Sequence, residues 1–458
     1  MINFKEEVLK RKEDFIKDLQ QLLRIKSELT EYNPNSKDAP FGPGNKEALE
    51  WFLALGKKDG FKTLNVDGYA GHVEYGDQKE YVAMIGHLDV VPALEGWKYP
   101  PYGAEIHNNR LYARGAEDDK GPTMAGYYAL KIIKELNLKL SKRIKCIVGV
   151  DEESGFRCMK HYFEKLPQQP VAGFIPDADF PVIHGEKGVT RTLITGKLQD
   201  DRILHLSGGS KDNMVSDFAS VEVLKNEDFA AKWTLYLSLN SLIGEVIEND
   251  NSYTLTIEGK SAHGAVPDEG VSAINLLFKG LIDIGITNNL VDYINKFLID
   301  DNYGVKLGIS YNDDVMGKLT NNFGVIKLSN RNFEINLNIR FPRGIDYYKY
   351  IIPTIKKTCD KYDFVVEVES YSDVLYYDPN SDMVKTLLNV YQKHTNDFSK
   401  PICIGGGTYA KSAKNVVAFG PGFPGKPSFI HQVNESIDLD DMMTAIAIYA
   451  ESLYELAK

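Results

Sequence analysis

Two runs of sequence, YVAMIG (81–86) and RIKCIVGV (143–150), decide the fold class of this chain. Both are short, apolar and followed by polar turns, which is typical of strands buried on both faces. The segment between them has apolar residues at helical spacing and Pro122 in its first turn. VAGFI (171–175) repeats the strand pattern. This alternation of strand and helix predicts a mainly parallel, covered sheet and therefore an α/β fold.

The same pattern extends toward both ends of the chain. Phe15, Leu19 and Leu22 recur at helical spacing and predict an amphipathic surface helix. Near the C-terminus, a helical pattern over about 381–394 is followed by the strand candidate VVAFG (416–420). Both ends of the chain are therefore expected to belong to one α/β domain.

The middle of the chain has a different pattern. TLYLSL (234–239), SYTLTIEG (252–259) and NFEINLNIRF (332–341) alternate apolar with polar residues. Such alternation predicts strands of a sheet with one open face. Helices are expected over about 270–284 and 345–360, so this segment is predicted to form an α+β unit.

The length of 458 residues is enough for two to four compact units. We expect an α/β domain in two parts, residues 1–187 and 373–458, interrupted by an α+β insertion over residues 188–372. An insertion of this size is itself as large as a domain.

The composition excludes several function classes. Lys and Arg number 53 against 64 Asp and Glu, a net charge of -11, which disfavours binding to nucleic acid or to anionic membranes. No apolar run is long enough to span a bilayer, and the N-terminal residues show no signal-peptide pattern. The four cysteines are far apart and form no C-x-x-C pair, so neither disulfides nor a thiolate metal site is expected. The cytoplasm is the expected compartment.

Acidic and imidazole side chains collect in five short segments that follow strands or lie in nearby loops. These segments are GHLDVVP (86–92), RGAEDDKGP (114–122), GVDEESGF (149–156), PDADFP (176–181) and FIHQVNESI (429–437). Each alone has an ordinary explanation, such as a hydrogen-bonded histidine, a helix-capping acid or an Asx turn. Together, at the carboxyl edge of an α/β sheet, two histidines and several carboxylates predict a site for two divalent ions of the zinc, manganese or cobalt type.

The order of these motifs resembles that of the di-zinc peptidases that include carnosinase, aminoacylase, succinyl-diaminopimelate desuccinylase and peptidase T. The D-K-G-P sequence, FPVIHGEKG (180–188) and SAHGAVPDEG (261–270) resemble the branch of bacterial dipeptidases known as peptidase V. The resemblance implies a zinc-peptidase-like catalytic domain, interrupted by a lid formed by the insertion. A lid as large as a domain could cover the site within one chain, as in the monomeric dipeptidase branch that this chain resembles, so a monomer is expected.

The resemblance also implies a role for each residue of the site. One ion would be held by His87 and Asp177 and the other by Glu153 and His431, with Asp118 between them. Glu152 would be the general base and then the acid, and Asp89 would orient His87. His263 would stabilise the oxyanion and Arg340 would bind the substrate carboxylate; further substrate contacts are implied for Asn213, Gly406 and Thr408. The additional Glu117 leaves open whether Asp118 or Asp119 bridges the ions, and the spacing from Arg114 favours Asp118. A cis peptide bond after the bridging residue is also implied.

These roles predict a metal-dependent dipeptidase that hydrolyses unblocked dipeptides, β-alanyl dipeptides among them, with Zn²⁺ as the first candidate metal and Mn²⁺ or Co²⁺ as alternatives. The alternative is a deacylase of N-acyl or N-succinyl amino acids on the same two-ion site. A non-catalytic metal-binding protein is disfavoured because Glu152 is present. The expected partner is a small peptide substrate.

Overall fold

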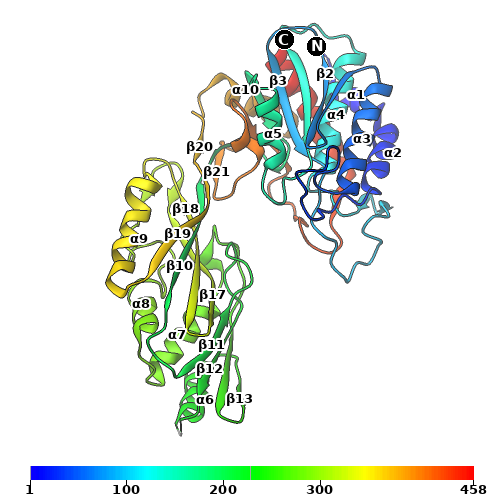
Figure 1. Ribbon diagram of the computed structural model, residues 1–458. Coiled ribbons are helices and arrows are strands. Elements are labelled where there is room, and N and C mark those ends of the chain that lie inside the picture. The colour runs from blue at the N-terminus through cyan, green and yellow to red at the C-terminus, as the bar shows by residue number, and fades with distance from the viewer. Residues whose placement is uncertain (1, 227) are drawn as a thin grey trace. The chain divides into compact units, whose positions relative to one another are not determined.

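The computed structural model describes residues 2–226 and 228–458, which form two compact units (Figure 1). The first unit takes the chain up to Gly185, then Tyr376–Ile402 and Thr408–Lys458. The second takes Glu186–Leu375 and the short segment Cys403–Gly407. That short segment joins the second unit because the Lys187 N–H donates to the Ile404 carbonyl at 3.0 Å. The sequence pattern gave no sign of this return of the chain.

The first unit is built on a nine-stranded mixed sheet. Its strands lie in the order β1 (Lys62–Val66), β2 (Ala70–Tyr75), β6 (Arg143–Gly149), β3 (Tyr81–His87), β7 (Ala172–Ile175), β22 (Val417–Ala418), β9 (Ile183–Glu186) and β20 (Leu375–Tyr376), and β21 (Ile402–Ile404) pairs with β9. The pairs β3–β6, β3–β7 and β7–β22 are parallel, as predicted. Antiparallel pairing of β1 with β2, of β2 with β6 and of β22 with β9 makes the sheet mixed.

The helices of this unit cover the central strands. They are α1 (Phe4–Leu9), α2 (Lys12–Leu23), α3 (Pro43–Lys58), α4 (Lys120–Glu135), α5 (Arg157–Lys165), α10 (Asp382–Thr395) and α11 (Leu439–Ala457). Every residue of β3 is buried, because α4 and α11 contact this strand and each other. The amphipathic helix predicted near the N-terminus is α2, whose buried residues are Phe15, Leu19, Leu22 and Leu23.

Smaller elements position the loops near the sheet edge. A three-stranded sheet joins β4 (Glu105–His107), β5 (Arg110–Tyr112) and β24 (Ser436–Asp438), and β8 (Ala178–Asp179) pairs in parallel with β23 (Pro421–Gly422). The short strand β24 pairs with β5, so the C-terminal part of the chain lies directly beside residues 110–112.

The second unit is an α+β structure with an antiparallel sheet. Its eight strands lie in the order β13 (Val246–Glu248), β14 (Ser252–Glu258), β12 (Phe218–Leu224), β11 (Ile203–Gly208), β17 (Thr320–Ser329), β18 (Asn332–Phe341), β10 (Gly188–Lys197) and β19 (Val365–Ser372). Its helices are α6 (Phe229–Leu239), α7 (Ala273–Asp283), α8 (Asn289–Phe297) and α9 (Ile352–Cys359). The strands predicted at 252–259 and 332–341 and the helix predicted at 270–284 are present as β14, β18 and α7.

The strand predicted at TLYLSL (234–239) is wrong, because these residues form the second half of helix α6. Phe229, Trp233, Tyr236 and Leu237 are buried in the core of this unit, and their spacing is helical. Leu239 is 73% exposed. The leucines at 235, 237 and 239 alternate as in a strand, but Phe229 and Trp233 just before them continue the apolar pattern at helical spacing.

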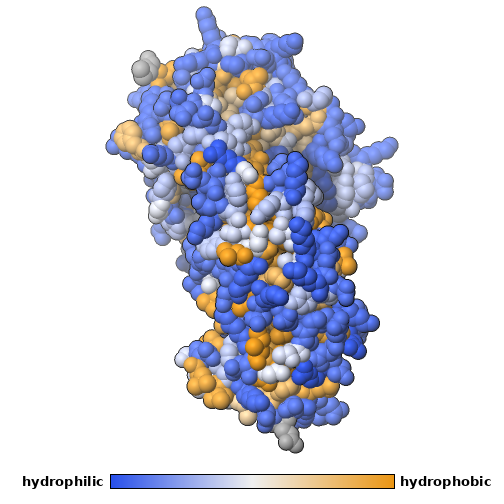
Figure 2. Space-filling view, turned by 90° about the vertical axis from the view of Figure 1, so that its left-hand side faces the viewer, coloured by the Kyte–Doolittle hydropathy of each residue, from blue (hydrophilic) through white to orange (hydrophobic). Residues whose placement is uncertain are grey.

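The outer surface is mostly hydrophilic on the face shown in Figure 2, with scattered apolar patches. Within the described part of the chain, no helix combines the length and the apolar character that spanning a bilayer requires.

Candidate metal centre

The first unit brings the acidic and imidazole side chains together at the carboxyl ends of three neighbouring parallel strands. His87 is the last residue of β3, Glu152 and Glu153 follow β6, and Asp177 follows β7. Because β6, β3 and β7 are adjacent and parallel, their carboxyl ends meet at one edge of the sheet. Asp118 comes from the turn that precedes α4.

Asp118 lies between the two histidines. Its Oδ1 is 2.9 Å from His87 Nε2, and its Oδ2 is 3.0 Å from His431 Nε2. His431 Nε2 is also 3.1 Å from Glu153 Oε1. His87 Nε2 is 3.7 Å from Asp177 Oδ2. The two histidines, 344 residues apart in the chain, therefore share one carboxylate, which is the convergence that a two-ion site requires.

Two overlapping groups of side chains place ligand atoms close enough to hold a metal ion. One comprises His87, Asp118 and Glu153, and the other comprises His87, Glu152 and Asp177; within each group the ligand atoms lie within 4.8 Å of one another. The donors are imidazole nitrogens and carboxylate oxygens without a thiolate, a set that suits zinc, manganese or cobalt.

The acids of this site are buried with too little positive charge to balance them. Burial, followed by the nearby carboxylates, raises the pKa of Glu152 and of Asp177 well above the usual range. Burial also raises the pKa of Glu153. Divalent cations would supply the missing positive charge, so the residues present fit the group that the sequence predicts.

The histidines supply part of that charge in the metal-free protein. Hydrogen bonds to Asp118 and Glu153 raise the pKa of His431 to about 10. Burial alone would lower the pKa of His87, but its bonds to Asp118 and Asp89 raise it well above the ordinary value. Those same bonds from the two imidazoles hold the pKa of Asp118 below its usual range, against the effect of burial. Metal binding would displace the imidazole protons.

Asp89 does more than the sequence reasoning assigned to it. His87 Nδ1 is 3.0 Å from the main-chain oxygen of Asp89 and 3.5 Å from its carboxylate. The two carboxylate oxygens accept the N–H groups of Glu152 at 3.1 Å and Glu153 at 3.0 Å. Asp89 is fully buried and therefore ties the end of β3 to the loop after β6.

Glu435 is a supporting residue whose role the sequence reasoning missed. It is fully buried, forms a 2.5 Å ion pair with Arg114, and accepts the N–H groups of Glu117 at 2.8 Å and Asp118 at 3.1 Å. Burial raises the pKa of Glu435 to about 7. The sequence offered one signal for this residue, its place four residues after His431. Its pairing with a distant arginine is a tertiary contact, which a local sequence pattern does not indicate.

Of the two adjacent aspartates, Asp118 alone faces both histidines. Asp119 Oδ2 accepts the His87 N–H at 3.0 Å and the Thr123 hydroxyl at 2.8 Å, and its other oxygen is buried without a partner. A side chain at Gly86 would come within 2.7 Å of this carboxylate, so glycine there admits Asp119 beside β3. The bond between Asp118 and Asp119 is cis, as the resemblance implied.

The second unit brings most of the predicted substrate-binding residues together. Arg340, on β18, is buried; its Nη2 is 3.3 Å from His263 Nε2, and its Nη1 donates to the Gly405 carbonyl at 2.6 Å. The Asn213 carbonyl accepts the Gly264 N–H at 2.7 Å, which places Asn213 beside the turn that carries His263. Gly406 follows Gly405 in the same unit.

Thr408 belongs to the first unit, where its hydroxyl accepts the Ala410 N–H at 3.1 Å and caps a short helix. The predicted contact of Thr408 with substrate stays a prediction.

Comparisons with known proteins identify relatives over the whole chain. The family described as "Peptidase family M20/M25/M40" matches residues 83–455. "Putative dipeptidase YtjP" of Bacillus subtilis is 39% identical over 471 residues, covering 100% of both chains. "Putative dipeptidase" of Staphylococcus epidermidis is 38% identical over 467 residues, covering 99% of both chains.

Two solved structures resemble the fold of this chain. Human carnosine dipeptidase 1 has a TM-score of 0.58 at 15% identity and covers 99% of this chain and 98% of its own. Aminopeptidase PepT of Bacillus cereus has a TM-score of 0.58 at 16% identity and covers 97% of this chain and 98% of its own. At these identities the likeness concerns the fold alone. Placement in the peptidase V branch stays a prediction.

Proposed function

The chain belongs to peptidase family M20/M25/M40 and is a peptide-bond hydrolase, and from this premise we propose that it is a metal-dependent dipeptidase. The observation that carries the proposal is Asp118, whose two carboxylate oxygens face His87 and His431. The close relatives over the full length of the chain are named as dipeptidases, which supports the same substrate class.

Two divalent ions would be held by five side chains: His87 and Asp177 for one ion, Glu153 and His431 for the other, and Asp118 for both. Zn²⁺ is the first candidate, with Mn²⁺ and Co²⁺ as alternatives. Ions of this kind, when bound, polarise the substrate carbonyl and lower the pKa of water, which then loses a proton readily and attacks the carbonyl.

Glu152 is proposed as the group that moves the proton. It lies beside His87 and Asp177 without the hydrogen bonds that Asp118 makes, and burial raises its pKa well above that of an ordinary glutamate. A carboxylate beside the attacking water accepts its proton and then passes it to the leaving amine. Asp89 would hold Glu152 in place through its main-chain N–H.

For the second unit we propose that Arg340 binds the carboxylate of the substrate. It is buried, and its guanidinium donates to Asn338 Oδ1 at 3.0 Å and to the Gly405 carbonyl at 2.6 Å, neither of which is an anion. A buried guanidinium without an anion is costly, and a substrate carboxylate would supply the missing partner in a two-pronged contact. Asn213, Gly406 and Thr408 are proposed as further substrate contacts.

His263 is proposed to stabilise the negative charge that develops on the carbonyl oxygen. Burial, together with the charge of Arg340, lowers the pKa of His263 to about 4, so its imidazole is neutral near pH 7. A neutral imidazole donates one hydrogen bond without bringing a second full charge beside Arg340. Cytoplasmic location and a monomeric state stay predictions.

A substrate panel tests the proposed function. The purified protein, loaded with Zn²⁺, Mn²⁺ or Co²⁺, would be assayed with α-dipeptides, β-alanyl dipeptides, tripeptides, and N-acetyl and N-succinyl amino acids. We expect the highest kcat/KM for unblocked dipeptides and little turnover of tripeptides. A preference for N-acetyl or N-succinyl amino acids would replace the dipeptidase proposal with the deacylase alternative.

A further inference from the structure

Glu117, the first of three consecutive acids in RGAEDDKGP, has no part in the chemistry proposed above. Its carboxylate accepts the N–H of Phe429 at 2.7 Å and a hydrogen bond from the Ser428 side chain. Its own N–H donates to Glu435 at 2.8 Å. Glu117 directly precedes Asp118 and therefore connects this part of the chain to the turn that leads into His431.

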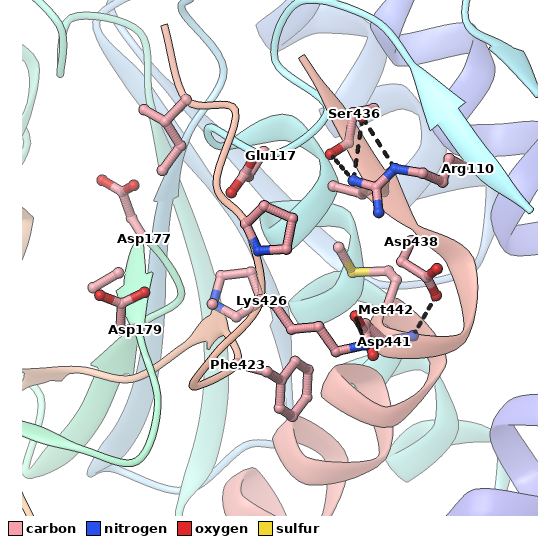
Figure 3. A pocket seen from close by; sticks show the side chains of 16 residues that line it. Arg110, Glu117, Asp177, Asp179, Phe423, Lys426, Ser436, Asp438, Asp441 and Met442 are labelled. Atoms are coloured by element: carbon pink, nitrogen blue, oxygen red, sulfur yellow. Dashed lines mark hydrogen bonds and ion pairs between the residues drawn. The ribbon is translucent and has the colours of Figure 1, made fainter. Parts of the chain in front are cut away.

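The loop over residues 421–430, which leads into His431, lines a cavity. Figure 3 shows this cavity between β8, the loop over residues 421–430 and the start of α11, with Glu117, Lys426 and Met442 on its walls. The loop is held at its start by the pairing of β23 with β8, and nearer His431 by side-chain contacts.

These side-chain contacts differ in strength. Lys426 pairs with Asp441 at 3.1 Å, with side chains that are 56% and 33% exposed, and solvent-accessible pairs of this kind contribute little. The Arg110 guanidinium lies 5.3 Å from the centre of the Phe429 ring. The bond from Glu117 to the Phe429 main chain is the charge-assisted one, and bonds of this type are about twice as strong as neutral ones.

His431 is a residue whose position needs such support. Its side chain is 50% exposed, and its φ of 60° lies in the left-handed region that is unfavourable for residues other than glycine. The N–H of Gln432 donates to the Phe429 carbonyl at 3.1 Å, so Phe429 and His431 belong to one tight turn. The position of Phe429 therefore sets the position of His431.

We propose that Glu117 is a positioning residue for the metal centre: it anchors the Phe429 main chain and so holds the imidazole of His431 toward Asp118 and Glu153. This inference rests on the proposed function, because His431 has to be a ligand for its position to matter. The ion held by His431 and Glu153 should depend on Glu117, and the ion held by His87 and Asp177 should not.

Metal affinity measured on the purified full chain tests this role. Metal-free wild type, Glu117→Ala, Glu117→Gln, His431→Ala and Asp441→Asn would be titrated with Zn²⁺ against a chelator, and bound zinc counted by elemental analysis. We expect one of two sites in Glu117→Ala to weaken about 10- to 100-fold, the usual effect of removing a partner that orients a ligand. Glu117→Gln keeps an oxygen for the Phe429 N–H and should retain most of the affinity. Asp441→Asn removes the exposed ion pair of the same loop and should bind as wild type does.

The outcomes distinguish failure of the positioning role of Glu117 from failure of the proposed function. If His431→Ala loses one ion while Glu117→Ala binds both as tightly as wild type, the positioning role of Glu117 is wrong and the proposed function stands. If His431→Ala also binds both ions normally, His431 is no ligand, and both proposals fail. Weakening of both sites together, with a lower melting temperature of metal-free Glu117→Ala, would mean a general structural role and would also overturn the inference.

Discussion

Glu152 is the residue on which the proposed chemistry depends most directly, and its position allows two roles. It lies within ligand distance of His87 and Asp177, so it could hold an ion, but it follows β6 beside Glu153, so it could serve a neighbouring ligand as base. We predict that Glu152→Ala retains both ions and loses about 10²- to 10⁴-fold in kcat, the usual contribution of a general base. Steady-state kinetics with elemental analysis of the same preparation checks both parts.

Two variants serve as controls for Glu152→Ala. Glu152→Gln keeps the size of the side chain and should lose comparable activity, because an amide does not accept the proton. Glu153→Ala should lose bound metal. Near-normal turnover of Glu152→Ala would remove Glu152 as base, and loss of an ion from this variant would make it a ligand instead.

At this scale the sequence could predict which residues come together and could not predict what supports them. His87, Asp118, Glu153 and His431 were expected at one site because their segments resemble the ordered motifs of a known family, and the structure brings them together. The choice of Asp118 over Asp119 gains support only from contacts, since Asp119 turns to the His87 main chain and Thr123. The buried pair of Arg114 with Glu435 joins residues 321 positions apart, which no local pattern contains.

At the scale of single elements, helix α6 shows how a leucine repeat can mislead. In a strand, Leu237 and Leu239 would point to the same face. In α6, Leu237 is 8% exposed and Leu239 is 73% exposed. We predict that Leu237→Ala lowers the free energy of unfolding by about 2–5 kcal/mol. Leu239→Ala should change it by less than about 0.5 kcal/mol.

Urea unfolding followed by circular dichroism measures the difference between these two matched variants. Equal destabilisation by Leu237→Ala and Leu239→Ala would favour the strand over the helix.

The strands β3, β6 and β7 were predictable because burial on both faces leaves short, wholly apolar runs. The antiparallel pairing of strands such as β2 could not be predicted, because the sequence of a strand does not indicate whether it runs parallel or antiparallel to its neighbour.

At the scale of the molecule, the candidate metal ligands come from both ends of the first unit. Four of the five proposed ligands precede the second unit in the chain, and His431 follows it. The predicted boundaries at 188 and 372 lie within three residues of the bounds Glu186 and Leu375. The return of Cys403–Gly407 could not be predicted, because its bonds to Lys187 and Arg340 are made by main-chain carbonyls, which every residue type provides.

In this arrangement the proposed metal ions would link distant parts of one unit, so removing them should destabilise the fold as well as abolish activity. An ion that binds only the folded state at 100 times its Kd adds about 2.7 kcal/mol. In a unit of this size we expect chelation to lower the melting temperature by roughly 5–10 °C and readdition of Zn²⁺ or Mn²⁺ to restore it. Differential scanning calorimetry of the full chain measures both shifts.

The double variant His87→Ala/His431→Ala is the control. It should melt at one temperature with or without ions, because its remaining carboxylates no longer hold a metal and repel one another in both conditions. An equal ion-dependent shift in that variant would mean that the stabilising ions bind elsewhere, and activity that survives full chelation would contradict metal-dependent hydrolysis itself.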